Sequence, residues 1–153
     1  MITYQQEFLC QVRKDIEPLL EKDWLEIEHE KNVRKLNPNW GLYEALEGQG
    51  ALAIFTARSD KTLIGYFVAI TMPSLHNQGI TQSMADVIYL DKQYRKGLIG
   101  YKMFRFAEKC LAEDGSDILH VTTTEVNPID SLMQRLGYSK TETKFEKVLQ
   151  WQQ

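Results

Sequence analysis

The residues with the clearest capacity for chemistry form the run "RKGLIG", residues 95–100, between an apolar stretch and an amphipathic helical pattern. Arg95 and Lys96 are cationic, and Gly97 and Gly100 leave the backbone open to close approach. The first N–H groups of a helix lack intrahelical partners and carry a partial positive charge, so they bind phosphate groups. The run is therefore predicted to bind a phosphate or diphosphate. A solvated turn, in which Gly97 serves only the backbone geometry, accounts for the same residues.

Other phosphate, metal and thiol chemistries have little support. The run matches neither GxxxxGK[ST] nor GxGxxG. Cys10 and Cys110 have no CxxC partners, and His29, His76 and His120 are scattered along the chain. We therefore expect no metal site and a reduced interior, with a disulfide between the two cysteines as the alternative.

Asp86 is the first candidate for proton transfer, because it interrupts the apolar run "MADVIYL", residues 84–90. On a regular strand its side chain would share a face with Met84, Ile88 and Leu90. Desolvation would raise the pKa of its carboxyl and make it a better proton acceptor. The alternative is a structural carboxylate that caps loop N–H groups or pairs with an arginine.

Two further side chains are candidates for catalysis, and a third is assigned to the core. His76 stands in a loop before residues 84–90, where a neutral imidazole could accept a proton, bind substrate or only order the loop. Glu125 follows the apolar segment 117–124 and faces either the same cleft or solvent. His120, within that segment, is predicted to be a core histidine with satisfied hydrogen bonds.

The elements that must position these residues follow from hydrophobic periodicity. Strands are predicted for alternating or apolar runs, and helices for spacings of three and four. The expected strands are 2–9, 51–58, 62–71, 84–90, 117–124 and 140–149, and the expected helices begin at Asp15, around Tyr43–Leu46, at Leu98 (ending at Glu113) and at Asn127. The order predicts one α/β domain over residues 1–153.

The last helix has sequence signals at both ends. Asn127 is predicted as its N-cap and Pro128 as its first residue. Gly137 is predicted to end it in a left-handed conformation. This helix therefore starts directly after the segment that contains Glu125.

Composition narrows the class of function. The chain has 153 residues and a formal net charge of −3, which argues against a nucleic-acid binder that works by bulk charge. Its start does not resemble a signal peptide, and it has no run of about 18 apolar residues for a membrane helix. We therefore expect a cytoplasmic protein that binds neither membranes nor nucleic acids.

The stretch "YLDKQYRKGLIGYKMFRFAE", residues 89–108, resembles the acyl-CoA-binding motif of GNAT N-acetyltransferases, Arg/Gln-x-x-Gly-x-Gly/Ala. "NPIDSLMQRLGY", residues 127–138, is similar to the later helix of that family and its Leu-Gly-Phe/Tyr end. The N-terminal half, and "PSLH" ahead of "ADVIYLD", resemble GNAT proteins carried by tailed phages. The resemblance covers nearly the whole chain.

The resemblance implies a single-domain GNAT fold, with a mixed, mostly antiparallel sheet of about six strands flanked by helices. It implies transfer of an acetyl group from acetyl-CoA to a primary amine of a small molecule or protein, by direct attack in a ternary complex without metal. A homodimer is possible, and the host cytoplasm is the expected location if a phage encodes the chain.

The resemblance also assigns the cofactor site residue by residue. It places the CoA diphosphate at Arg95, Lys96, Gly97, Leu98, Ile99 and Gly100, and the pantetheine arm at the backbone of Leu90 and near Asn127. Leu98 stands where the family usually has glycine, which implies a less permissive backbone there. Family members often use an acidic residue on the strand of Asp86 as base, directly or through water.

The proton donor for the departing thiolate is the weak point of the resemblance. Met133 stands where many family members have a tyrosine, and methionine cannot donate a proton. Tyr101, Tyr138 or water could replace it, although Tyr138 also suits the core. The alternative function is therefore a catalytically impaired CoA-binding fold that serves as a protein-interaction module.

Overall fold

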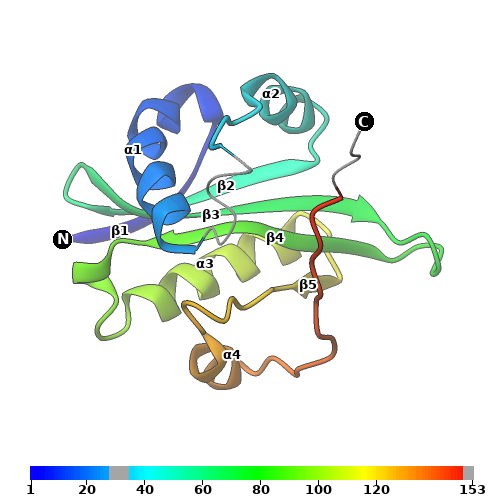
Figure 1. Ribbon diagram of the computed structural model, residues 1–153. Coiled ribbons are helices and arrows are strands. Elements are labelled where there is room, and N and C mark those ends of the chain that lie inside the picture. The colour runs from blue at the N-terminus through cyan, green and yellow to red at the C-terminus, as the bar shows by residue number, and fades with distance from the viewer. Residues whose placement is uncertain (28–34, 150–153) are drawn as a thin grey trace.

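The computed structural model describes residues 1–27 and 35–149, and within them five strands form one sheet. The elements are β1 (Ile2–Glu7), α1 (Leu9–Ile27), α2 (Trp40–Gly48), β2 (Leu52–Ser59), β3 (Thr62–Pro73), β4 (Thr81–Leu90), the 3₁₀ helix η1 (Lys92–Tyr94), α3 (Ile99–Glu113), β5 (Ile118–His120) and α4 (Asp130–Leu136). The strands follow chain order across the sheet (Figure 1). All neighbours pair antiparallel except β4 and β5, which are parallel.

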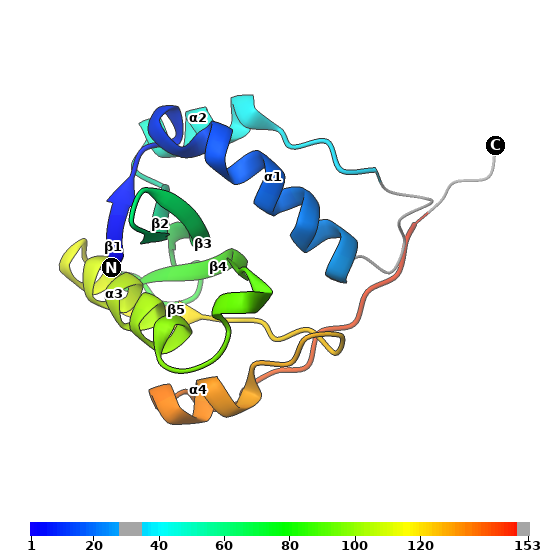
Figure 2. The same ribbon diagram turned by 90° about the vertical axis from the view of Figure 1, so that its left-hand side faces the viewer.

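Helices cover both faces of the sheet, with α1 and α2 on one side and α3 and α4 on the other (Figure 2). The central strands β2 and β3 are buried on both faces, so their sequences are almost continuously apolar. Val68 packs on the α1 side, while Phe67 points to α3 and meets Phe104 edge-on at 5.2 Å between ring centroids. The sheet therefore separates two layers of core.

β4 contains an extra residue at Asp86. Val68 pairs with Val87 and Ala69 pairs with Ala85, so Asp86 has no partner on β3. Such a β-bulge re-aims side chains and strengthens the local twist of a strand. The bulge lies in the middle of β4, at the residue that the sequence singled out as the first candidate for proton transfer.

β4 and β5 are paired only near their starts. The parallel ladder joins Gln82–Met84 to Ile118–His120, and β5 then ends. In the part of the chain that the structure describes, residues 85–90 of β4 have no neighbouring strand on that side. The sheet is thus open along the second half of β4.

Several expected boundaries are wrong. α1 begins at Leu9, earlier than Asp15, and the strand expected over 117–124 is only the three residues of β5. Residues 140–149 are not a strand, and Phe145 and Leu149 are 92% and 74% exposed. A strand needs a neighbouring strand edge to pair with, and the three-residue β5 offers too short an edge.

Among the described residues no helix is long and apolar enough to cross a membrane.

Candidate active site

The loop between β4 and α3 folds as a tight turn that leads directly into the helix. Asp91 caps η1, since its carboxylate accepts a hydrogen bond from the Gln93 N–H at 3.3 Å. Gly97 has a φ of +83°, so the positive-φ position of this turn is filled by a glycine. Leu98 has φ −109° and ψ 4°, which any residue can adopt. The departure from glycine at residue 98 is therefore accommodated without strain.

The start of α3 presents a group of open backbone donors. The first bond of the helix runs from the Lys102 N–H to the Leu98 carbonyl at 2.9 Å. No described residue accepts a hydrogen bond from the backbone N–H groups of residues 96–101. A Cβ added at Gly100 would lie 3.7 Å from Leu90 Cδ2 and 3.8 Å from Leu132 Cδ2, which is ordinary contact. Internal packing therefore does not require glycine at this position.

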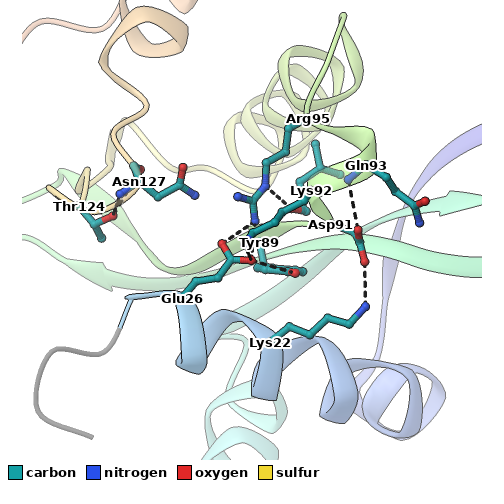
Figure 3. A network of polar contacts seen from close by, with 10 residues as sticks. Lys22, Glu26, Tyr89, Asp91, Lys92, Gln93, Arg95, Thr124 and Asn127 are labelled. Atoms are coloured by element: carbon teal, nitrogen blue, oxygen red, sulfur yellow. Dashed lines mark hydrogen bonds and ion pairs between the residues drawn. The ribbon is translucent and has the colours of Figure 1, made fainter.

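Arg95 points away from these donors and toward α1 (Figure 3). Its Nε donates to the Leu90 carbonyl at 2.7 Å, and its Nη2 lies 2.8 Å and 3.1 Å from the two carboxylate oxygens of Glu26. The guanidinium also lies over the Tyr89 ring, 5.4 Å from the centroid. The structure thus brings Leu90 and Arg95 together, and both already have protein partners.

Two more ion pairs connect α1 to the same loop. Lys22 Nζ lies 2.9 Å from Asp91 Oδ2, and Lys92 Nζ lies 3.7 Å from Glu26 Oε1 (Figure 3). The pair to Asp91 holds the pKa of that carboxyl below its usual range. A hollow of about 420 Å³ lies at this junction, lined by Lys22, Leu25, Glu26, Tyr89, Asp91 and Lys92. The loop that leads to α3 is therefore fastened to the opposite helical layer.

Asn127 does not cap α4, contrary to expectation. The helix begins at Asp130 with Ile129 as its N-cap, and Gly137 ends it in the left-handed conformation as predicted. The hydroxyl of Thr124 accepts from the Asn127 N–H at 3.2 Å, and the Thr123 hydroxyl accepts from the Ile129 N–H at 2.9 Å. Threonine hydroxyls compete with helical hydrogen bonds in this way, so the turn is longer than the sequence indicated.

The bulge places Asp86 on the side of the sheet covered by α1 and α2. Burial is the main cause of the raised pKa values of Tyr43 and Tyr66, which both belong to that side, and the charge of Asp86 adds to both. Ile88 and Leu90 pack on the opposite side, so the expectation that they share a face with Asp86 is wrong. The extra residue breaks the two-residue alternation on which that expectation rested.

Asp86 is open to solvent, yet the surrounding protein partly desolvates it. Burial raises the pKa of its carboxyl, and the charge of Lys144 partly offsets this effect. Among the described residues its carboxylate forms no ion pair or hydrogen bond. An unpartnered carboxylate with a raised pKa suits proton acceptance.

The other candidates are not gathered around Asp86. His76 is exposed in the loop after β3, and within the described residues only its backbone N–H is hydrogen-bonded, to Ser74 Oγ at 3.4 Å. Glu125 is exposed, and its side chain has no hydrogen bond or ion pair within the described residues. His120 is exposed on the edge strand β5, 3.4 Å from Gln82 Oε1, so its assignment to the core is wrong. A three-residue strand at the sheet edge is too short to bury it.

The alternative proton donors already have other contacts. Tyr138 is half-buried, and burial and a hydrogen bond to Glu108 raise the pKa of its hydroxyl. The Tyr101 ring lies under the Arg135 guanidinium at 5.6 Å. Met133 packs against the core on the α3 side.

The carboxyl of Asp23 in α1 is buried, and it was not among the candidate residues identified from the sequence. Asp23 is 7% exposed, and burial raises the pKa of its carboxyl to about 7. A signal for it exists in the sequence, because Asp23 continues the apolar face of α1 seven residues after Ile16 and three after Leu20. An acidic residue in an apolar stripe is uncommon unless it is paired.

These elements define a GNAT-like α/β fold, in which a mixed sheet is flanked by helices. The sequence matches no protein-family model and no curated protein. Solved structures nevertheless share the fold over nearly the whole chain. The described residues contain no cluster of His, Cys, Asp or Glu that could hold a metal, and His29 lies outside them.

Three solved structures illustrate the similarity. A ribosomal-protein-alanine N-acetyltransferase from Brucella melitensis biovar Abortus 2308 is 17% identical, with a TM-score of 0.73, covering 98% of this chain and 100% of that one. An aminoglycoside acetyltransferase from an uncultured soil metagenomic sample is 14% identical, with a TM-score of 0.76 and coverages of 98% and 99%. A predicted acetyltransferase with acetyl-CoA from Clostridium acetobutylicum is 12% identical, with a TM-score of 0.69 and coverages of 97% and 96%.

Proposed function

We propose that this protein is an acetyl-CoA-dependent N-acetyltransferase that moves an acetyl group to a primary amine by direct attack in a ternary complex. One observation carries the proposal: the backbone N–H groups of residues 96–101 lack acceptors among the described residues, at the start of a helix. Such donors bind phosphate oxygens. The acetyl-CoA in the Clostridium acetobutylicum structure, which has the same fold, supports this choice of anion.

The residues present fit the cofactor. Acetyl-CoA supplies the acetyl group as a thioester. Lys96 and the open N–H groups would hold its diphosphate, and the unpaired edge of β4, residues 85–90, would hydrogen-bond to the pantetheine arm, with Asn127 nearby. Arg95 would reach the diphosphate only after its guanidinium leaves Glu26.

Asp86 is the group we assign to proton acceptance. An amine must be neutral to attack a thioester, so its ammonium form has to lose a proton to a base, directly or through water. The raised pKa of Asp86 and the absence of an ion pair to any described residue support this role. His76 and Glu125 stay secondary candidates. For the leaving thiolate, Tyr101, Tyr138 or water would have to act in place of the tyrosine that Met133 replaces.

A second candidate function is a CoA-binding module that has lost catalysis and acts through protein interactions. Met133 favours it, because this side chain cannot protonate the thiolate and packs in the core. The phage-type assignment, the homodimer, the host cytoplasm and the choice between small-molecule and protein acceptors rest on the sequence resemblance alone.

Thermal unfolding with acetyl-CoA tests the cofactor assignment. A ligand at 100 times its Kd stabilises the folded state by about 2.7 kcal/mol, so the melting temperature should rise by several degrees. An unchanged melting temperature at saturating acetyl-CoA would contradict both candidate functions. Thiol release measured across primary amines then separates them, since the module binds acetyl-CoA without releasing CoA.

A further inference from the structure

The last segment that the structure describes, residues 139–149, is exposed and unpaired. It contains no helix or strand, and beyond α4 it runs as an extended trace (Figure 1). Within the described residues, no hydrogen bond joins the backbone of residues 139–145 to the rest of the chain. The side chain of Phe145 is 92% exposed. Free backbone N–H and C=O groups in an extended segment are a template for pairing with another chain.

The sequence of this segment gives it two different faces. Successive side chains of an extended chain point to opposite sides. Thr141, Thr143 and Phe145 would therefore share one face. The other face would carry four charges of alternating sign, at Lys140, Glu142, Lys144 and Glu146.

The open edges of this protein's own sheet do not match that pattern. Of the described strands, β5 offers three residues without a formal charge. The outer edge of β1 and residues 85–90 of β4 carry one carboxylate each, on Glu7 and Asp86. Opposite charges stabilise a strand pair only where they face each other. An alternation of lysine and glutamate therefore finds no matching edge among these strands.

A second copy of the segment does match. In antiparallel pairing centred on Thr143, each charged residue of the segment lies opposite a residue of opposite charge. Opposite charges and threonine pairs are favourable cross-strand neighbours. Glu146 already has an interaction within its own chain, so the central pair of charges is the better place for a test. The facing pairs in this register are Thr143 with the partner's Thr143, Glu142 with the partner's Lys144, Thr141 with the partner's Phe145, and Lys140 with the partner's Glu146.

We propose that residues 139–147 form an antiparallel β-ribbon with the same residues of a second copy, which makes this segment the contact surface of a symmetric homodimer. The two-fold axis passes through the Thr143 pair, so every other pair occurs twice, as an isologous interface requires. Phe145 gains a cross-strand neighbour, which it lacks in the single chain. This dimer would form whether or not the chain transfers acetyl groups.

The dimer should dissociate on dilution. A ribbon of this length is small beside the roughly 800 Å² per partner that a standard stable interface buries. Sedimentation equilibrium of the full chain, from about 5 μM to about 1 mM, should therefore show a monomer that converts to a dimer as the concentration rises. Amide hydrogen exchange of residues 139–147 should slow over the same range. A chain that stays monomeric throughout would overturn the proposal, and so would amide protection that does not depend on concentration, because the segment would then pair within its own chain.

Charge reversal at the central pair tests the register. Glu142→Lys places a lysine opposite the partner's Lys144, and Lys144→Glu places a glutamate opposite the partner's Glu142. Each variant alone should raise the dimer dissociation constant at least about tenfold, because like charges then face each other twice. Lys61→Glu and Glu44→Lys are the matched controls, since they make the same changes of charge at exposed positions in the β2–β3 turn and on α2, and they should leave the constant unchanged.

Mixing the two variants separates this register from any other contact between copies. One copy with Glu142→Lys and one with Lys144→Glu again place opposite charges at both central pairs. A heterodimer should therefore form with about the dissociation constant of the wild-type dimer, and the double variant should pair with itself in the same way. Dimers that resist both single variants, or a mixture that stays monomeric, would overturn the proposal.

Discussion

Arg95 Nη2 lies 2.8 Å from Glu26 Oε2, so a residue predicted to hold a diphosphate is bound to the helix on the other side of the sheet. Both side chains are mostly buried, and the Nε of Arg95 is also bonded to the Leu90 carbonyl. An anion at the start of α3 must therefore compete with Glu26 for this guanidinium. The same ion pair links α1 to the loop between β4 and α3.

Replacing Glu26 with Gln should strengthen acetyl-CoA binding several-fold, because Arg95 would be released toward the diphosphate. The free energy of unfolding should fall by about 1 kcal/mol, as expected for a partly buried ion pair. Isothermal titration calorimetry with acetyl-CoA measures the first effect. Glu17→Gln, which breaks the exposed Arg13–Glu17 pair on the same helix, is the control and should leave affinity unchanged. Weaker binding in Glu26→Gln would mean that the pair positions the loop for the ligand.

Replacing Gly100 with Val should lower acetyl-CoA affinity at least tenfold. The protein has room for a Cβ there, so the fold should survive, but a branched side chain would cover the open N–H groups. Gly48→Val is the control, since it also lies in a helix and a Cβ there meets nothing within 4 Å. Equal affinity for the two variants would contradict the placement of the diphosphate.

Replacing Asp86 with Asn should lower kcat/KM at least a hundredfold and leave the Kd for acetyl-CoA unchanged. A base that accepts a proton in the rate-limiting step typically contributes 10²–10⁴-fold. Because the pKa of Asp86 is raised, the wild-type rate should increase with pH until that pKa is passed. His76→Ala and Glu125→Gln are comparison variants, and we expect less than a threefold loss because both side chains are exposed and unbonded in the described structure. Full activity of Asp86→Asn would remove it from the mechanism.

Replacing Asp23 with Asn should stabilise the unliganded protein above pH 7. The folded-state pKa of about 7 lies above the ordinary value of 3.8, so the folded protein holds this proton more tightly than the unfolded chain does. The contribution is fully present below pH 3.8 and is lost as the pH rises toward 7, and each pH unit between the two pKa values corresponds to about 1.4 kcal/mol. Asp23→Asn should remove this loss and gain about 2–4 kcal/mol at pH 8. Urea unfolding of both proteins at pH 5 and pH 8 measures the difference, which would be absent if Asp23 had an ordinary pKa.

The sequence predicted the fold where local patterns decide it. The apolar runs of β2 and β3 and the spacings in α3 encode buried faces, and the turn at Gly97 and the end of α4 at Gly137 were recognisable from their glycines. The candidate diphosphate site follows from these local features, because a helix start brings its own donors. This part of the site could therefore be proposed before the structure was known.

The rest depends on contacts between distant residues. The partnership of Arg95 with Glu26 spans 69 positions, and no local spacing predicts it. The side of the sheet on which Asp86 lies depends on the register of β3 against β4. Whether residues 140–149 can form a strand depends on how far β5 extends. Asn127 lost its capping role to the hydroxyls of Thr123 and Thr124, which bind the backbone just before α4.

Because of the bulge, the proposed proton acceptor Asp86 is not one of the β4 residues that pair with β3. Ala85 and Val87 already face opposite sides and pair with consecutive residues of β3, so excising Asp86 would leave a regular ladder with both neighbours in place. Asp86 is thus an inserted residue that the pairing of β3 with β4 does not use. If Asp86 is the proton acceptor as proposed, substitution or deletion at this position would alter or silence the proposed reaction while the sheet keeps its pairing.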